Sequence, residues 1–200
     1  MTTHINTYLD LMHEVKRRHL SLQTAFNEPY RLMFQAVVID HCYLQIRKML
    51  ELIAFSTLSA NQHALSAVQH GKTRDYHAEK VLRSIERKFG QVYPRPIHQR
   101  MDPRPGVRAD FADLTEGFLT RAEFAALYDE CGNVLHGRNP FRKPLDLDYY
   151  WPRIPEWSGK IRALLDSHIA TIVNDPHMHL IQMGAGDARP TVSTFARIRD

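Results

Sequence analysis

The densest group of chemically able side chains lies in residues 119–141, LTRAEFAALYDECGNVLHGRNPF. The group comprises Tyr128, Asp129, Asn133, His136, Arg138 and Asn139. A histidine exchanges protons near neutral pH, so His136 is a candidate acid–base or phosphate-contacting residue, with Tyr128, Asn133 and Asn139 as hydrogen-bonding neighbours. The alternative is structural, because a cationic histidine near a helix C-terminus gains about 0.3–1 kcal/mol from the helix dipole.

A second set of polar residues interrupts the most apolar stretch of the chain. Asp40, Arg47 and Glu51 are spaced 7 and 4 residues apart, which places them on one stripe of a helix. Arginine four residues before glutamate is the less favourable order for stabilising an isolated helix. The pair therefore suggests a role beyond helix stability, although solvent exposure or structural pairing explains the stripe equally simply.

Arginines and prolines alternate in residues 91–110, QVYPRPIHQRMDPRPGVRAD. Four prolines exclude a helix or a central strand, so we expect a long loop. Its arginines, together with one beside the histidine above, are the candidate nucleic-acid contacts: Arg95, Arg100, Arg104, Arg108 and Arg138.

The sequence gives little sign of a metal or cofactor. His177 and His179 share one face of a predicted strand, which is half of a metal site without an identifiable third ligand. HExxH, G-x-S-x-G and a phosphate-binding glycine loop are all missing from the sequence. We therefore expect no metal and no cofactor.

Composition indicates one folded domain with an appendage. The 200 residues are 44% apolar and 24% charged, with a net charge of +4, which is compatible with a nucleic-acid partner without requiring one. Cys42 and Cys131 lie in apolar helical segments, so we expect reduced thiols and a cytoplasmic protein. We expect no signal peptide and no membrane span.

Sequence signals mark both ends of the helix that carries the first group. Thr120 and Glu123 form a capping box at its start, and an apolar stripe from Phe124 to Leu135 should face a core. Gly137 is expected to end the helix in the left-handed conformation, which places His136 in the last turn.

Similar patterns predict the other elements. Helices are expected over residues 6–24, 30–57, 59–71, 76–89 and 155–174, with the second long and central and His168 on the apolar stripe of the last. Residues 177–183 and 191–198 predict a β-hairpin around Gly184–Asp187. The predicted fold is all-α: a helical bundle over 1–175, with a small C-terminal hairpin over 176–200 packed on it.

Over residues 28–175 this architecture resembles the HEPN domains, which are all-α, usually dimeric, and often metal-independent RNases of toxin–antitoxin, CRISPR and phage-defence systems. Their motif is an arginine followed after four to six residues by histidine. Only Arg162 and His168 have that spacing. The residue directly after the arginine is commonly polar in the family, whereas Ala163 is apolar here. The side chains of Arg162 and His168 would also lie about 120° apart on an ideal helix. A looser likeness joins Tyr128-x-x-Cys131, Leu135-His136 and Asn139-Pro140-Phe141 with Arg47-x-x-x-Glu51.

The resemblance implies a function and a site. It implies a HEPN-like protein of the RNA-targeting or defence class, with metal-independent endoribonuclease activity as its catalytic form and with RNA and a second copy or another protein as partners. The implied catalytic residues are His136, Arg47, Glu51, Tyr128 and Asn139, with Arg47 and Glu51 facing His136 across a shared groove. The alternative is a non-catalytic helical interaction module in which these polar residues are structural.

Overall fold

A computed structural model describes residues 2–64, 77–100, 110–137, 140–141 and 143–196, with only the backbone described at 2, 3 and 100. A helical hairpin forms its framework. Helix α1 (Thr2–Asn27) and helix α2 (Gln35–Ala60) are joined through the 3-10 helix η1 (Pro29–Leu32). The two helices pack against each other. On α1 the buried residues Tyr8, Met12 and Val15 recur at helical spacing and so form one apolar side.

Helix α2 is the central element, as predicted, and contributes the largest set of buried side chains. Its C-terminus is tied to a distant segment by Asn61, which is fully buried. The Asn61 amide donates to the carbonyls of Thr57 (2.9 Å) and Thr171 (3.1 Å) and accepts from the Val173 N–H (2.7 Å). The short 3-10 helix η2 (Gln62–Ala64) follows.

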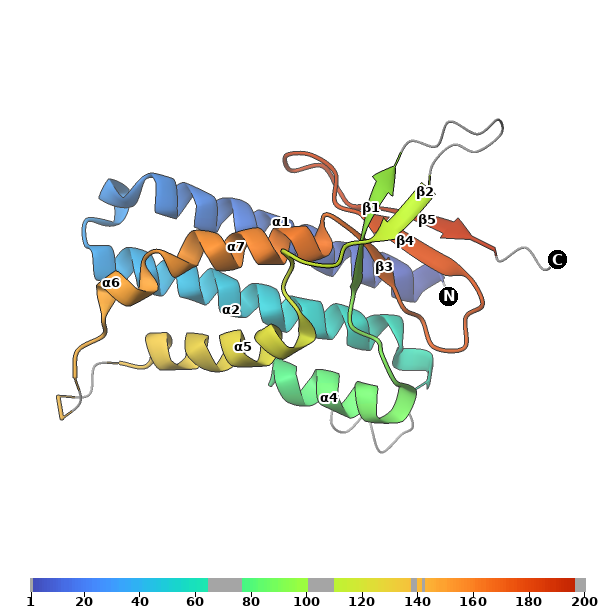
Figure 1. The fold of residues 1–200 in the computed structure, drawn as a ribbon, viewed down its shortest axis with the longest axis horizontal. Helices are drawn as coiled ribbons and strands as arrows, with labels where there is room; N and C mark the ends of the chain where they lie inside the picture. Colours follow the sequence, from blue (N-terminus) through green and yellow to red (C-terminus); the bar gives the residue numbers. More distant parts are fainter. Residues whose placement is uncertain (1, 65–76, 101–109, 138–139, 142, 197–200) are drawn as a thin grey trace.

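The other helices lie on two sides of α2 (Figure 1). Helix α7 (Arg153–Leu165) runs on the side of α1, and helices α4 (Ala78–Phe89) and α5 (Arg121–Leu135) cover the other side. The single-turn helix α6 (Leu147–Tyr150) leads into α7. None of the described helices combines the length and the apolar character needed to cross a bilayer.

A five-stranded antiparallel sheet closes one end of the molecule (Figure 1). Its strands are β1 (Arg95–Arg100), β2 (Asp110–Asp113), β3 (Ser167–Ala170), β4 (Met178–Gln182) and β5 (Thr191–Phe195), in the order β2-β1-β3-β4-β5. The face carrying His168 and Ile181 packs on the helices, and the Tyr8 hydroxyl of α1 lies 2.7 Å from His168 Nε2. The other face buries Ile97, Ile169 and Leu180 in a separate apolar cluster.

The sheet curls until its two edges touch. The ring of Phe111 on β2 lies 5.8 Å from the ring of Phe195 on β5, although these strands are at opposite edges. Phe111 also packs against the second apolar cluster, so this contact between the edges lies beside that cluster.

The predicted fold class is therefore wrong: the protein is an α+β fold, not an all-α bundle with a small hairpin. The predicted helix 155–174 ends at Leu165 and continues as β3, because a stripe that includes His168 and Ile169 fits either period and strand pairing decides between them. His168 is buried, as expected, but on a strand.

The proline-rich segment also contains a strand that its prolines hide. Residues 95–96 pair with β3 and residues 97–100 pair with β2, so Pro96 lies where β1 changes partners. At that junction the missing N–H of proline is tolerated.

Several local predictions are confirmed and one is wrong. The capping box at Thr120, the glycine end of α4 at Gly90 (φ 78°) and the hairpin of β4 and β5 are present. Helix α5 ends differently, because His136 takes an extended conformation (ψ 133°) and Gly137 is not left-handed. Most of the helix predicted over 59–71 lies outside the described residues.

Candidate functional site

Arg47 lies at the centre of a polar cluster between α2 and α5. Its Nη2 donates to the Tyr128 hydroxyl at 3.1 Å, and its guanidinium carbon lies 4.5 Å from the centre of the Tyr128 ring. The arginine side chain remains 30% exposed. Tyr128 thus fixes a cation in place without shielding it from solvent.

Gly132 gives this guanidinium its place against α5. A Cβ built at Gly132 would lie 3.6 Å from Arg47 Nη1, which is an ordinary van der Waals contact. Any longer side chain at this position would extend into the space of the guanidinium.

Glu51 forms ion pairs with two cationic side chains of α2. Its carboxylate lies 3.4 Å from Arg47 Nε and 2.8 Å from Lys48 Nζ, and it is only 14% exposed. Two cations share one carboxylate, so this group keeps a net positive charge toward solvent.

Tyr128 is a hydrogen-bonding residue here and not a base. Burial raises the pKa of its hydroxyl, although Arg47 acts in the opposite direction, so the phenol stays protonated at neutral pH. Its ring packs 4.9 Å from the ring of His77, the residue that precedes α4. Three helices, α2, α4 and α5, therefore meet at Tyr128, and we call the residues Arg47, Lys48, Glu51, His77, Tyr128 and Gly132 the Arg47 cluster.

His136 is not part of this cluster. It follows Gly132 by four residues, so it lies one turn farther along the same side of α5, and its side chain is exposed. It comes eight residues after Tyr128, a rise of about 12 Å along a helix. No contact of His136 with Arg47 or Glu51 is found among the described residues.

The direction of the helices explains this separation. Tyr43 contacts Glu130 and Arg47 contacts Tyr128, so α2 and α5 run antiparallel. Glu51 consequently lies level with residues that precede Tyr128 and away from His136. The expected groove joining Arg47 and Glu51 to His136 therefore does not form as a direct contact.

The remaining predicted site residues are scattered or outside the described residues. Arg95 is on β1, where its guanidinium forms an ion pair with Asp113 at 2.6 Å. Arg100 ends β1, and its side chain is not described. The residues outside the described part of the chain are Arg104, Arg108, Arg138 and Asn139.

Sequence reasoning missed three members of the cluster: Lys48, His77 and Gly132. A glycine inside a helical pattern usually has a packing or functional reason, so Gly132 was a usable signal. His77 carried none, because only the fold brings the start of α4 to Tyr128.

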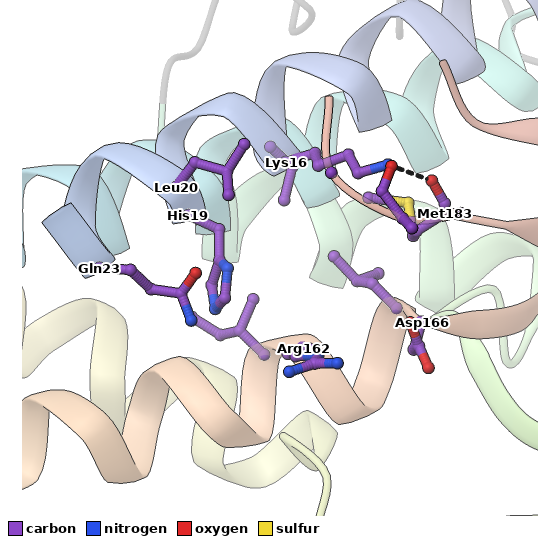
Figure 2. A pocket seen from close by; sticks show the side chains of 13 residues that line it. Lys16, His19, Leu20, Gln23, Arg162, Asp166 and Met183 are labelled. Carbon is purple, nitrogen blue, oxygen red and sulfur yellow. Dashed lines mark hydrogen bonds between the residues drawn. The ribbon is translucent and has the colours of Figure 1, made fainter. Parts of the chain in front are cut away.

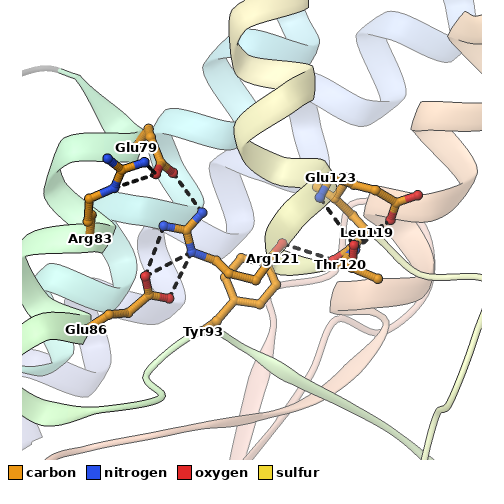
Figure 3. A network of polar contacts seen from close by, with 8 residues as sticks. All are labelled: Glu79, Arg83, Glu86, Tyr93, Leu119, Thr120, Arg121 and Glu123. Carbon is orange, nitrogen blue, oxygen red and sulfur yellow. Dashed lines mark hydrogen bonds and ion pairs between the residues drawn. The ribbon is translucent and has the colours of Figure 1, made fainter.

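A second charged network, between α4 and α5, is fully paired and stabilises the packing of these two helices. Arg121 on α5 donates to Glu86 at 2.8 Å and to Glu79 at 2.7 Å on α4, and Arg83 pairs with Glu79 (Figure 3). The Tyr93 hydroxyl donates to the carbonyl of Leu119 in the same region. With its charges satisfied on neighbouring helices, this network joins α4 to α5 and offers no open site.

His177, just before β4, and His179 on β4 share the buried side-chain carboxylate of Asp175. Asp175 accepts from His177 Nδ1 at 2.7 Å and from His179 Nε2 at 2.8 Å, and it is 1% exposed. Burial acts to raise the pKa of Asp175, but the hydrogen bonds from both histidines hold it at about 2. Within the described part of the chain, no group of three potential ligands is arranged to hold a metal ion.

Comparison with protein-family models, with curated proteins and with solved structures found no match for the chain. The HEPN resemblance therefore stays an expectation from the sequence. The function has to be argued from the chemistry of the Arg47 cluster.

Proposed function

We propose that the protein is a HEPN-like, RNA-targeting protein that contacts the RNA backbone through the Arg47 cluster. The observation that supports this proposal is a guanidinium fixed by Tyr128 and Glu51, 30% exposed, with Lys48 beside it. A planar, always charged guanidinium on a rigid support is well suited to phosphate.

Arg47 has donors to spare. Of its five N–H groups, the described contacts use Nε toward Glu51 and one on Nη2 toward Tyr128. Both N–H groups of Nη1 and the second of Nη2 have no partner among the described residues. They can donate two parallel hydrogen bonds to phosphate oxygens.

A catalytic version of this function needs an acid–base group beside the phosphate. In metal-independent RNA cleavage the 2′-oxygen bonds to the adjacent phosphorus while the bond from phosphorus to the 5′-oxygen breaks; a base accepts the 2′-hydroxyl proton, the departing 5′-oxygen takes up a proton from an acid or water, and a cation stabilises the charge that develops. Arg47 would supply the cation. The candidate base is His136, exposed one turn beyond Gly132 on the same side of α5, which has no described contact with Arg47, so cleavage requires that the bound RNA span both residues.

RNA binding and RNA cleavage in EDTA test both parts. We expect Arg47→Gln to weaken binding of single-stranded RNA about tenfold and to remove cleavage, since an arginine–phosphate contact contributes about 1.5–3 kcal/mol. His136→Ala should remove cleavage and leave binding nearly unchanged. Arg87→Gln, at an exposed arginine on α4 with no described partner, is the matched control. Wild-type protein that neither binds nor cleaves RNA would refute the proposal.

A non-catalytic interaction module is the second candidate, and one surface favours it. Tyr30, Met33, Phe34 and Val37, at the corner between α1 and α2, are 73%, 79%, 64% and 43% exposed. Contiguous exposed apolar side chains often mark contact sites for proteins. We propose that in this module a second copy of the chain covers this corner.

The mass of the protein in solution tests this second candidate. Light scattering after size exclusion should give a dimer for the wild type and a monomer for Phe34→Glu, with Phe141→Glu, at another exposed phenylalanine, as the control. A monomeric wild type would contradict it.

We also propose a cytoplasmic setting, which the two buried free thiols of Cys42 and Cys131 support.

A further inference from the structure

A cavity of about 300 Å³ lies between α1, α7 and the loop that joins β4 to β5 (Figure 2). None of its lining residues belongs to the Arg47 cluster. Its volume is at the lower end of the range for small-molecule sites in proteins.

The loop wall of this cavity is held in place by a buried lysine. Lys16 Nζ donates to the carbonyls of Met183 (2.5 Å), Ala185 (3.3 Å) and Ala188 (2.8 Å). Gly184 and Gly186 take the left-handed backbone (φ 67° and 50°) that shapes this turn. The wall is therefore built before any ligand arrives.

Lys16 also leaves a positive charge without a partner of opposite sign. Among the described residues, no carboxylate lies within ion-pair distance of its Nζ, and its three donors are used by carbonyls. The ammonium therefore cannot bind a ligand directly, but its field favours an anion in the cavity beside it.

Two polar side chains in the cavity have no partner among the described residues. Arg162 on α7 is exposed and Gln23 on α1 is half-buried, and neither side chain makes a described hydrogen bond or ion pair. Figure 2 shows Gln23 and His19 extending from α1 toward α7, where Arg162 lies. His19 is already engaged, because its Nε2 lies 2.9 Å from Ser158 Oγ.

Most of the other side chains in the lining, apart from Asp166, are apolar. Val15, Ile161, Leu165 and Met183 supply hydrocarbon walls next to these polar groups. A largely apolar pocket with a few convergent donors is typical of a site for an organic molecule with one charged end.

We propose that this cavity binds a small organic carboxylate. The Arg162 guanidinium and the Gln23 amide donate to the carboxylate, and the apolar walls cover its hydrocarbon body. Arginine suits this role because its paired N–H groups match the two carboxylate oxygens. Asp166, which follows α7 and also lines the cavity, opposes any anion, so we expect a ligand with a single negative charge that contacts Arg162.

Isothermal titration calorimetry of the full chain with hexanoate, hexanol and hexylamine at millimolar concentrations tests this proposal. We expect hexanoate to bind at least about ten times more tightly than hexanol, as a charged hydrogen bond predicts, and hexylamine to bind more weakly still. Arg162→Gln should reduce hexanoate affinity to the level of hexanol. Arg87→Gln should leave it unchanged.

Arg162→Gln changes an exposed side chain without a described partner, so the circular dichroism spectrum of this variant should match that of the wild type. The absence of hexanoate binding would overturn the proposal. Equal affinity for hexanol, preference for hexylamine, or full hexanoate affinity in Arg162→Gln would also overturn it.

Discussion

At the scale of single residues, the Tyr128 hydroxyl should matter for stability as well as for the site. Tyr128→Phe keeps the ring on His77 and Arg47 but removes the hydroxyl that accepts a hydrogen bond from Arg47 Nη2. We expect a loss of about 1–2 kcal/mol in the free energy of unfolding, measured by urea denaturation. Tyr149→Phe, at a half-exposed tyrosine, is the control. Equal stability of the two variants would mean that the Tyr128 hydroxyl contributes nothing.

Gly132 gives a prediction of the opposite sign. Gly132→Ala adds a Cβ at ordinary contact distance from Arg47 Nη1, and alanine favours a helix over glycine by about 0.5–1 kcal/mol. We expect the variant to be more stable by about that amount. Gly159→Ala in α7, where a Cβ meets nothing within 4 Å, should be stabilised equally. Destabilisation of Gly132→Ala alone would show that Arg47 packs more tightly than described.

Part of the site was readable from single residues. The spacing of Arg47 and Glu51 predicted that they share one stripe of a helix, and the structure pairs them on α2 and brings Arg47 to Tyr128, while a role beyond helix stability stays a prediction. Sequence could not supply the direction of α5 relative to α2, and this direction decides that Tyr128, and not His136, meets Arg47. His77 reaches the cluster only through tertiary packing.

At the scale of elements, Asn61 should be the main connection between the end of α2 and the segment after β3. Asn61→Ala leaves the Thr57 and Thr171 carbonyls and the Val173 N–H without their described partner. We expect a loss of about 2–3 kcal/mol in unfolding free energy, because buried polar groups are left unpaired.

Asn133→Ala is the matched control for this loss, since Asn133 is exposed on α5. A thermal or urea unfolding curve of each variant gives the comparison. If both variants unfold like the wild type, Asn61 does not join the two elements.

The helices and the β4–β5 hairpin were predictable from the sequence, and the other three strands of the sheet were not. Amphipathic periods and end signals such as Gly90 and the Thr120–Glu123 box mark helices locally. A strand such as β3 depends on partners far along the chain, and its four residues, SHIA, continue an apolar helical stripe. Pro96 concealed β1 for a related reason, because only the change of partner at that residue makes proline acceptable.

At the scale of the whole molecule, His168 couples the sheet to the helices and should make stability depend on pH. Its Nδ1–H donates to the Leu165 carbonyl at 2.8 Å, so Nε2 accepts from Tyr8. Burial lowers the pKa of His168 to about 4, against 6.5 for an unperturbed histidine. Between these values the unfolded chain binds the proton and the folded chain does not, so stability falls as pH falls.

This difference corresponds to about 3 kcal/mol lost between pH 6.5 and pH 4. Urea denaturation across that range measures it. The slope with pH should be smaller in His168→Gln, while His13→Gln, at a residue far less buried than His168, should keep the wild-type slope. An unchanged slope in His168→Gln would show that His168 is not the group responsible.

We propose separate functions for the helices on the two sides of α2. The α2, α4 and α5 side carries the Arg47 cluster, proposed to contact RNA, and the α1 and α7 side carries the cavity proposed to bind a carboxylate. Each side presents an arginine with N–H groups that have no partner among the described residues.

The salt dependence of RNA affinity tests the central claim most directly. Each phosphate neutralised by a cationic side chain adds about 0.7 to the slope of log affinity against log salt for single strands. Wild type and Arg47→Gln, compared by fluorescence anisotropy, should differ by about this amount, with weaker binding in the variant at every salt concentration. Identical affinity and slope in the two proteins would contradict phosphate binding at Arg47.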